Sequence, residues 1–264
     1  MSGQSHRSDP RILHRRTLQR DHRRLSGILR PGMSVLDVGC GVGAITAGIA
    51  KAVAAPGGDG RVVGLDRDPD NLAVAREHAG ELPNLSYELG DALILPFESA
   101  FDIVTAARTL QWISEPGIAL ANMKKAAKPG GRVVVLDYNL ADNRWEPGLP
   151  AEFARFYAAF LDWRASNQWD NRMADHLPDL FRASGLAEVQ VHISDEIAER
   201  GDPDFSQTAG IWTYVTGTLG PRIAAAGFLT ESECVDAERA YLDWVANGLN
   251  RQTMVMRTVE GIAP

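Results

Sequence analysis

The sequence predicts an α/β fold in which helices cover both faces of a mostly parallel β-sheet. The first observation is an apolar segment, residues 35–38, that runs through alternating glycines into a helical pattern. The second is that this strand-then-helix order recurs at 61–66, 85–89 and 101–107. Strands and helices that alternate at this spacing form parallel sheets with right-handed crossovers. A ligand is then expected at the carboxyl ends of the strands.

The first turn has the composition of a ligand-binding turn. Gly39, Gly41 and Gly43 let the backbone bend and approach a ligand without Cβ clashes. Free N–H groups at the start of the next helix, predicted over 44–53, point into this turn. Asp37 lies within the apolar strand, where a carboxylate is costly unless it meets a donor. The alternative is an ordinary strand-to-helix turn with a hydrogen-bonded aspartate.

Acidic residues follow the next two strands. The glycine turn also fits the G-x-G-x-x-A pattern of dinucleotide-binding proteins. Asp66, however, lies further from Gly39 than the roughly 20 residues of that fingerprint. Asp91, in Gly90-Asp91-Ala92, could accept a hydrogen bond from an adenine amine. Acids at three strand ends favour a ligand that combines a free amine, a ribose and an adenine over a nicotinamide dinucleotide.

With these residues the sequence resembles the class I S-adenosylmethionine-dependent methyltransferases. The matching segments are 37–43, 66, 90–92, 101–108 and 128–135. The resemblance implies a Rossmann-like, seven-stranded sheet with an antiparallel last strand, and S-adenosylmethionine as cofactor. The cofactor-binding residues it implies are Asp37, Gly39, Cys40, Gly41, Asp66, Arg67, Asp91, Ala92, Arg108 and, before the sheet, Thr17. The overall appearance is nearest to bacterial enzymes related to the quinone-biosynthesis methyltransferases.

The composition narrows the function. The chain of 264 residues is long enough for one large domain or a domain with a cap. Two cysteines do not make a disulfide framework or a metal site, so a reduced, cytoplasmic protein is the default expectation. No apolar run reaches the roughly 18 residues of a membrane span. The net charge is −7 although residues 1–30 hold eight arginines, so an acidic body favours a small-molecule substrate over nucleic acid.

We expect a core interrupted by helical insertions. Residues 1–30 are predicted to form a basic segment, helical from Arg11 to Leu29, that closes over the cofactor. Arg15, Arg16, Thr17 or Gln19 would then lie near the methionine carboxylate; a surface helix and a nucleic-acid or targeting arm are the alternatives. The expected divisions are a core at 31–140, a cap insertion at 141–171, core again at 172–194, a helical cap at 195–250 and the final core strand at 251–264. The fifth and last strands are placed at 132–138 and 253–259, and cap helices at 204–218 and 230–249. The cap could also form a homodimer surface.

The methyl acceptor is expected between the core and the cap. Gln111 and Trp112 follow the fourth strand, and Trp145 and Tyr157 lie in the first cap insertion. The helix that carries Tyr157 has further aromatic residues at spacings of three and four, a stripe that is more often core than a substrate wall. These residues are Phe153, Phe156, Phe160 and Trp163.

The sulfonium methyl group is itself electrophilic, so the enzyme has mainly to hold a nucleophile in line and exclude water. A general base is optional; by location alone Tyr157 and His176 are candidates, with His14 and His22 on the basic segment, and a structural role is the alternative for each. No cluster has the spacing of metal ligands. The competing functions are a nicotinamide-dependent oxidoreductase, a non-catalytic regulatory protein that binds S-adenosylmethionine, and an RNA methyltransferase that docks through the arginines.

Overall fold

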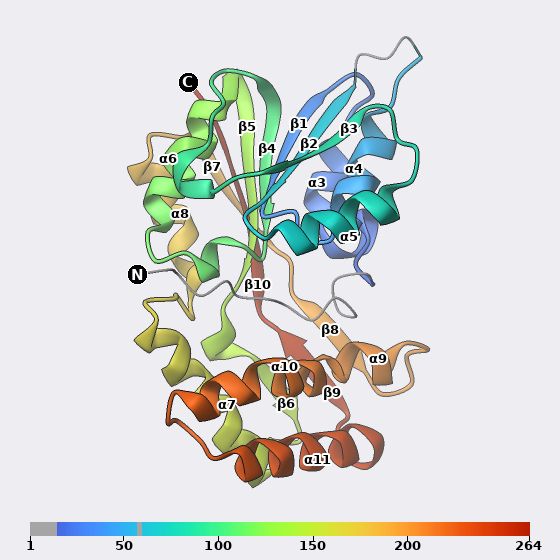
Figure 1. Cartoon of the computed structure of the whole chain (residues 1–264), viewed down its shortest axis with the longest axis vertical. Helices are drawn as coiled ribbons and strands as arrows, with labels where there is room; N and C mark the ends of the chain where they lie inside the picture. The colour runs from blue at the N-terminus through green and yellow to red at the C-terminus, as the bar shows by residue number, and fades with distance from the viewer. Residues whose placement is uncertain (1–14, 57–59) are drawn as a thin grey trace.

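The computed structural model describes residues 15–56 and 60–264. A seven-stranded sheet forms its core, in the order β3-β2-β1-β4-β5-β10-β7 (Figure 1). Six of its strands run in the same direction, and β10, which lies between β5 and β7, is antiparallel to both. The strands are β1 (Ser34–Val38), β2 (Arg61–Asp66), β3 (Leu85–Leu89), β4 (Phe101–Ala107), β5 (Ala127–Tyr138), β7 (Ala187–Ile193) and β10 (Met256–Ile262). The predicted fold class is therefore confirmed.

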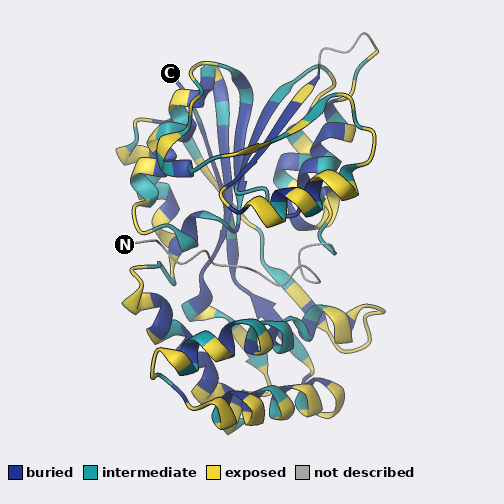
Figure 2. Ribbon diagram, in the orientation of Figure 1, coloured by how far each residue is buried: buried dark blue, intermediate teal, exposed yellow. Residues whose placement is uncertain are grey.

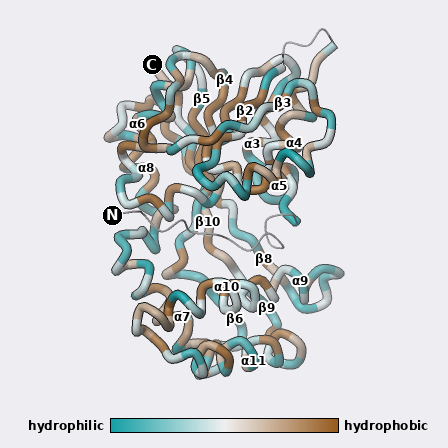
Figure 3. Tube along the Cα trace, in the orientation of Figure 1, coloured by the Kyte–Doolittle hydropathy of each residue, from teal (hydrophilic) through white to brown (hydrophobic). Residues whose placement is uncertain are grey.

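Helices cover both faces of this sheet because successive strand residues point to opposite sides. Val35 and Val62 pack on one face against the helices near the N-terminus, and Leu36 and Val63 pack on the other. The first face carries α2 (Leu18–Asp21), α3 (Arg23–Ile28) and α4 (Ala44–Val53), with α5 (Pro69–Ala79) beside α4. The second carries α6 (Pro116–Ala126) and α8 (Met173–Ala183). Figures 2 and 3 show the central strands of the sheet as largely buried and hydrophobic, whereas the edge strands β3 and β7 are mostly exposed.

Several predicted elements match the structure to the residue. The strands at 61–66, 85–89 and 101–107 and the helix at 44–53 have the expected bounds. Each has an uninterrupted local pattern between clear turn signals, so local chemistry alone delimits it.

The N-terminal prediction is wrong in one respect. Residues 11–14, including His14, lie outside the described residues; the rest of the predicted helix is two short helices, α2 and α3, separated at His22. The His22 backbone leaves helical geometry, and its ring is only 1% exposed. Its Nε2 lies 3.0 Å from Thr105 Oγ1, which itself donates to the carbonyl of Val134. The break therefore lets the ring enter the space beside the sheet.

Two strand predictions also need correction. The fifth strand begins at Ala127 instead of Arg132, since Gly130 N–H donates to the Ala263 carbonyl and Ala263 N–H donates to Gly131. The expected last strand is two strands, β10 and β9 (Arg251–Met254), that meet at Val255. β9 pairs outside the core sheet, so the predicted core segment 251–264 does not start in that sheet.

A second body, here called the helical lobe, comprises residues 140–171 and 195–254 (Figure 1). It contains a three-stranded sheet, β6-β9-β8, that the sequence analysis did not predict. Its elements are η3 (Leu140–Asp142), β6 (Arg144–Glu146), α7 (Ala151–Ser166), β8 (Glu196–Glu199), α9 (Phe205–Ala209), α10 (Ile211–Ala225), α11 (Glu231–Asn247) and β9. Short 3-10 helices η1 (Ala92–Ile94) and η2 (Leu110–Trp112) follow strands β3 and β4 in the core.

The aromatic stripe of α7 fills the interior of the helical lobe. Phe153 and Phe156 are fully buried, and the Phe153 ring centroid lies 4.1 Å from that of Tyr241 on α11. Trp212 of α10 packs edge-on against Phe153 and Tyr157. In the described part of the chain, no helix is both long and apolar enough to cross a membrane.

A buried carboxylate ties α3 to β10, and we predict that Glu260→Gln destabilises the protein by about 1–3 kcal/mol at pH 7. Glu260 is 1% exposed and accepts a 3.0 Å bond from Arg24 Nε. Burial acts to raise the pKa of Glu260, but the bond and charge of Arg24 lower it below the ordinary value. The carboxylate therefore stabilises the fold above its unfolded pKa, and this contribution is lost as the pH falls.

Urea denaturation of the two proteins measures this difference. Asp236→Asn, which removes an exposed pair with Arg239, is the control and is expected to stay within about 0.5 kcal/mol of wild type. If the destabilisation by Glu260→Gln did not shrink towards pH 3, the charged carboxylate of Glu260 would not be the stabilising group.

Candidate active site

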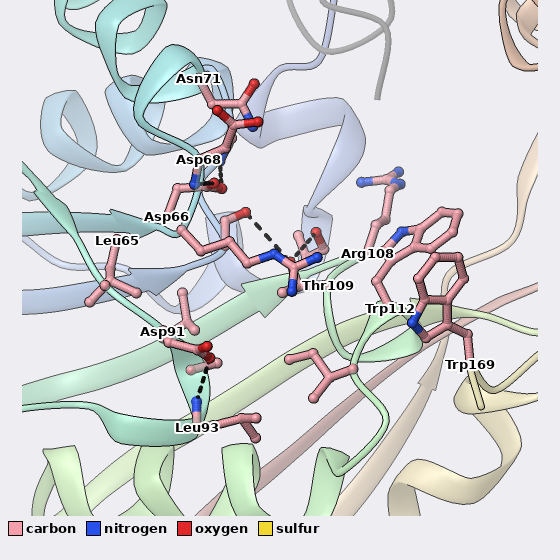
Figure 4. A pocket seen from close by; sticks show the side chains of 18 of the residues that line it. Leu65, Asp66, Asp68, Asn71, Asp91, Leu93, Arg108, Thr109, Trp112 and Trp169 are labelled. Carbon is pink, nitrogen blue, oxygen red and sulfur yellow. Dashed lines mark hydrogen bonds between the residues drawn. The ribbon is translucent and has the colours of Figure 1, made fainter. Parts of the chain in front are cut away.

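A cavity of about 410 Å³ lies at the carboxyl ends of the parallel strands (Figure 4). This volume falls within the range of small-molecule sites. The lining comes from the glycine turn, the ends of β2 and β3, the segment after β4 and the end of the helical lobe's α7. Its residues include Arg16, Gly39, Gly41, Asp66, Arg67, Asp68, Asn71, Asp91, Ala92, Arg108, Thr109, Trp112, Ile113, Asn167, Gln168 and Trp169.

The glycine turn forms one side of the cavity. Gly39 has a φ of +73°, and a Cβ at this position would lie 2.4 Å from Thr109 Cγ2. The N–H groups of Gly39 and Cys40 donate to the Leu65 carbonyl at 2.7 and 3.0 Å. Glycine is thus required because the backbone passes between β2 and the segment after β4 with no space for a side chain.

Two of the predicted acids face the cavity. Asp66 accepts 2.8 Å and 2.9 Å bonds from the N–H groups of Gly41 and Asp68, which hold its carboxylate at the end of β2. Asp91 accepts from Leu93 N–H at 2.9 Å and caps η1 at the end of β3. Arg67 and Ala92, the neighbours of these acids, also line the cavity. Figure 4 shows both carboxylates on the side opposite Trp112 and Trp169.

Asp37 and Cys40 lie behind the lining. Asp37 accepts a 2.6 Å bond from Thr46 Oγ1, and burial raises the pKa of this carboxyl to about 7 against the opposing effect of that bond. Burial likewise raises the pKa of the Cys40 thiol. The sequence predicts both residues in the cofactor site, but in the structure neither lines the cavity.

Arg108 reaches the cavity, but its side chain is engaged elsewhere. Its backbone has a φ of +59°, and its Nε donates to the Tyr138 hydroxyl at 2.8 Å. The guanidinium also donates to the Asp21 carbonyl and lies 3.6 Å from Glu196 Oε2. Burial opposes the charge, yet Tyr138, Glu196 and Asp21 together raise the pKa of Arg108. Arg108 therefore links the cavity to the basic segment and to β8.

From the basic segment, Arg16 lines the cavity and Thr17 does not. Thr17 is exposed and caps α2, where its Oγ1 accepts from Arg20 N–H at 3.2 Å. Burial and the charge of Arg108 lower the pKa of Arg16. His22 is also outside the cavity, and burial lowers the pKa of its imidazole to about 3.

Two indoles form the wall of the cavity away from the acids. Trp112 follows β4, Trp169 follows α7, and their ring centroids lie 5.1 Å apart at 77°. Trp112 was predicted to face the acceptor, whereas Trp169, Asn167 and Gln168 were missed. The only sequence signal for them was the aromatic content of the segment after strand five, which did not identify the residue.

The other acceptor and base candidates lie away from this cavity. Trp145 and Tyr157 are part of the aromatic interior of the helical lobe, where burial raises the pKa of Tyr157 and Asn143 donates to its hydroxyl. Gln111 is buried beneath Trp112, and its N–H donates to Asp137. His176 is on the exposed side of α8, with Nδ1 2.6 Å from Asp170 Oδ2. These positions give none of them a contact to a ligand in the cavity.

Comparison with known proteins identifies the family. The model of the methyltransferase domain family matches residues 29–179, more than half of the chain. The chain therefore belongs to this family, which confirms its resemblance to the class I S-adenosylmethionine-dependent methyltransferases. Within residues 15–56 and 60–264, no group of three or more histidine, cysteine or acidic residues could hold a metal ion.

Among curated relatives, it is 38% identical over 134 residues to a demethylmenaquinone methyltransferase of Staphylococcus aureus, covering 50% of this chain and 52% of the relative. It is 40% identical over 123 residues to the ubiquinone/menaquinone biosynthesis C-methyltransferase UbiE of Teredinibacter turnerae, covering 45% and 48%. The chain thus spans about half the length of these relatives. A solved phosphoethanolamine N-methyltransferase 2 of Haemonchus contortus, with S-adenosylhomocysteine bound, shares the fold at a TM-score of 0.57 and 19% identity, covering 91% of this chain and 51% of that one.

The buried Asp37 carboxyl predicts a pH dependence of stability. Its ordinary pKa is about 3.9, so between pH 4 and 7 the unfolded chain releases a proton that the folded protein retains. The free energy of unfolding should therefore fall as the pH rises through this window and level off above it. Asp37→Asn lacks this loss. The free energy of unfolding of the variant minus that of wild type should therefore increase from pH 4 to pH 7.

Urea denaturation at pH 4.5, 6 and 8 measures this difference. Asp137, whose pKa burial also raises to about 7, is present in both proteins and cancels in the comparison. Parallel pH profiles for the two proteins would show that Asp37 titrates normally.

Proposed function

We propose that this protein transfers a methyl group from S-adenosylmethionine to a small-molecule acceptor. The observation that carries the proposal is that a single cavity joins the glycine turn, the carboxylates of Asp66 and Asp91, and an indole wall. Membership of the methyltransferase family supports the same reaction.

The residues present fit the cofactor. Asp66 would bind the ribose hydroxyls, Asp91 the adenine amine, and the backbone at Gly39 and Gly41 the amino-acid portion. Neither glycine carries a Cβ, so the backbone there can approach a ligand closely. When bound, S-adenosylmethionine supplies a methyl group on a positively charged sulfur, which is already a strong electrophile.

The chain's own contribution is to bind, orient and exclude water. Among the described residues of the lining there is no histidine, cysteine, lysine or tyrosine that could remove a proton from the acceptor. Its carboxylates lie at the end proposed for adenosine. An acceptor that is nucleophilic without a protein base, such as an unprotonated amine or an enolate-like carbon, therefore fits this cavity better than an aliphatic alcohol.

The acceptor class is proposed from the relatives and the wall. Two relatives are named for methyl transfer in demethylmenaquinone and ubiquinone/menaquinone biosynthesis. Trp112, Trp169 and Ile113 offer an apolar surface. A quinol ring carbon is therefore the first acceptor to test. A cytoplasmic location, a homodimer and the absence of a nucleic-acid partner stay predictions.

We predict that Asp66→Ala weakens binding of S-adenosylhomocysteine about 10- to 150-fold. This range corresponds to the roughly 1.5–3 kcal/mol of hydrogen bonds to a charged group. Isothermal titration calorimetry measures the affinity, with the exposed Glu77→Ala as control, which should match wild type. Wild-type affinity in Asp66→Ala would remove the ribose assignment.

The reaction itself is tested with methyl-labelled S-adenosylmethionine and demethylmenaquinol bearing a short side chain. We expect labelled product with wild type and none above background with Asp66→Ala at low cofactor concentration. A panel of small phenols and amines accompanies the quinol. Tight binding of S-adenosylhomocysteine without transfer to any of them would favour the non-catalytic regulatory function.

A further inference from the structure

Arg164 lies directly behind the indole wall. It belongs to α7 of the helical lobe and is fully buried, at 0% exposure. Its Cζ lies 4.0 Å from the centroid of the Trp112 ring. Trp169 packs edge-on both against Trp112 and against Trp163, the residue before Arg164. One buried cation thus supports the wall from the side away from the cavity.

The hydrogen bonds of Arg164 reach both segments that carry the indoles. Its Nη2 donates to the carbonyl oxygen and the Oε1 of Gln111, the residue before Trp112, at 3.0 and 3.2 Å. Its Nε donates to Asn171 Oδ1, two residues after Trp169, at 2.7 Å. The planar guanidinium therefore sets the position of η2 relative to the end of α7, because its donors have fixed directions.

Stability alone does not account for this arginine. Within the described ranges, no carboxylate lies within 4.0 Å of its guanidinium, and Nη1 is buried without a hydrogen-bond partner. Burial lowers the pKa of Arg164 to about 10 although Asp137, Tyr157 and Asp170 act to raise it. Keeping a charge out of water without an ion-pair partner is costly, so this cation is poor evidence of added stability.

We propose that Arg164 is a positioning residue for the methyl acceptor: it holds Trp112 and Trp169 at a fixed angle so that they present one wall to the acceptor. This inference rests on the proposed function. If Asp66 and Asp91 bind the adenosine, the wall across the cavity from them faces the acceptor. Arg164 would contact neither S-adenosylmethionine nor the methyl acceptor. It acts by joining the helical lobe to the core at the cavity.

The experiment uses the full chain labelled with 5-fluorotryptophan and ¹⁹F NMR, with resonances assigned by single Trp→Phe variants. The variants are Arg164→Met, Arg164→Lys and the matched control Arg155→Met, whose arginine is exposed on the same helix. In Arg164→Met we expect the Trp112 and Trp169 signals to shift or broaden, while Trp212 and Trp244 keep theirs. Arg164→Lys should lie between this variant and wild type, and Arg155→Met should match wild type.

Two further readouts separate positioning from a structural role. The midpoint of thermal unfolding of Arg164→Met should fall by no more than about 5 °C, because a buried charge is removed while acceptors on Gln111 and Asn171 lose their donor. Its affinity for S-adenosylhomocysteine should stay within about threefold. With S-adenosylhomocysteine bound, 2-naphthol serves as a flat, uncharged probe. It should shift the Trp112 and Trp169 signals of wild type and shift them less in Arg164→Met.

Several results would overturn the proposal. Unmoved Trp112 and Trp169 signals would mean that Arg164 does not position the wall, and a larger fall in the midpoint with all tryptophan signals displaced would mean a structural role. Loss of S-adenosylhomocysteine affinity comparable to Asp66→Ala would assign the wall to the cofactor. No response of the wild-type wall to 2-naphthol would remove its link to the acceptor. If Arg164→Met does not fold, Arg164→Lys carries the same comparisons.

The proposed function fails separately, and is recognised by absence of S-adenosylhomocysteine binding to wild type. In that case the indole signals of the Arg164 variants still report whether the arginine sets the wall.

Discussion

The site depends on how closely the backbone of the glycine turn packs between two other segments. Gly39 and Cys40 donate to Leu65 at the end of β2, and Thr109 occupies the space that a Gly39 side chain would need. This contact fixes three strand ends relative to one another, because parallel strands end at the same edge of the sheet. Asp66 and Arg108 consequently line the same cavity.

Around this turn the protein buries charges at a cost. Asp37 and Asp137 lie beneath the cavity with raised pKa values, and Arg108 and Arg164 connect it to the basic segment and to the helical lobe. Such groups contribute little to stability in this environment. They do restrict how the lobe and the core meet, and the proposed acceptor wall lies at that junction.

The fold does not determine the chemistry. A common scaffold can carry many different reactions, so function has to be argued from the site. Here the family match and the two acids Asp66 and Asp91 favour methyl transfer. The proposed acceptor wall is formed by residues outside the glycine turn.

The sequence by itself determined the parallel sheet, the glycine turn and the acids at the ends of β2 and β3. Each is a contiguous pattern whose geometry follows from local backbone chemistry. Only the tertiary structure decided that Trp169 lines the cavity with Arg164 behind it, and that β6 and β9 pair Trp145 with Gln252. These contacts join residues far apart in the chain, so packing of the two bodies selects them and no local periodicity records them.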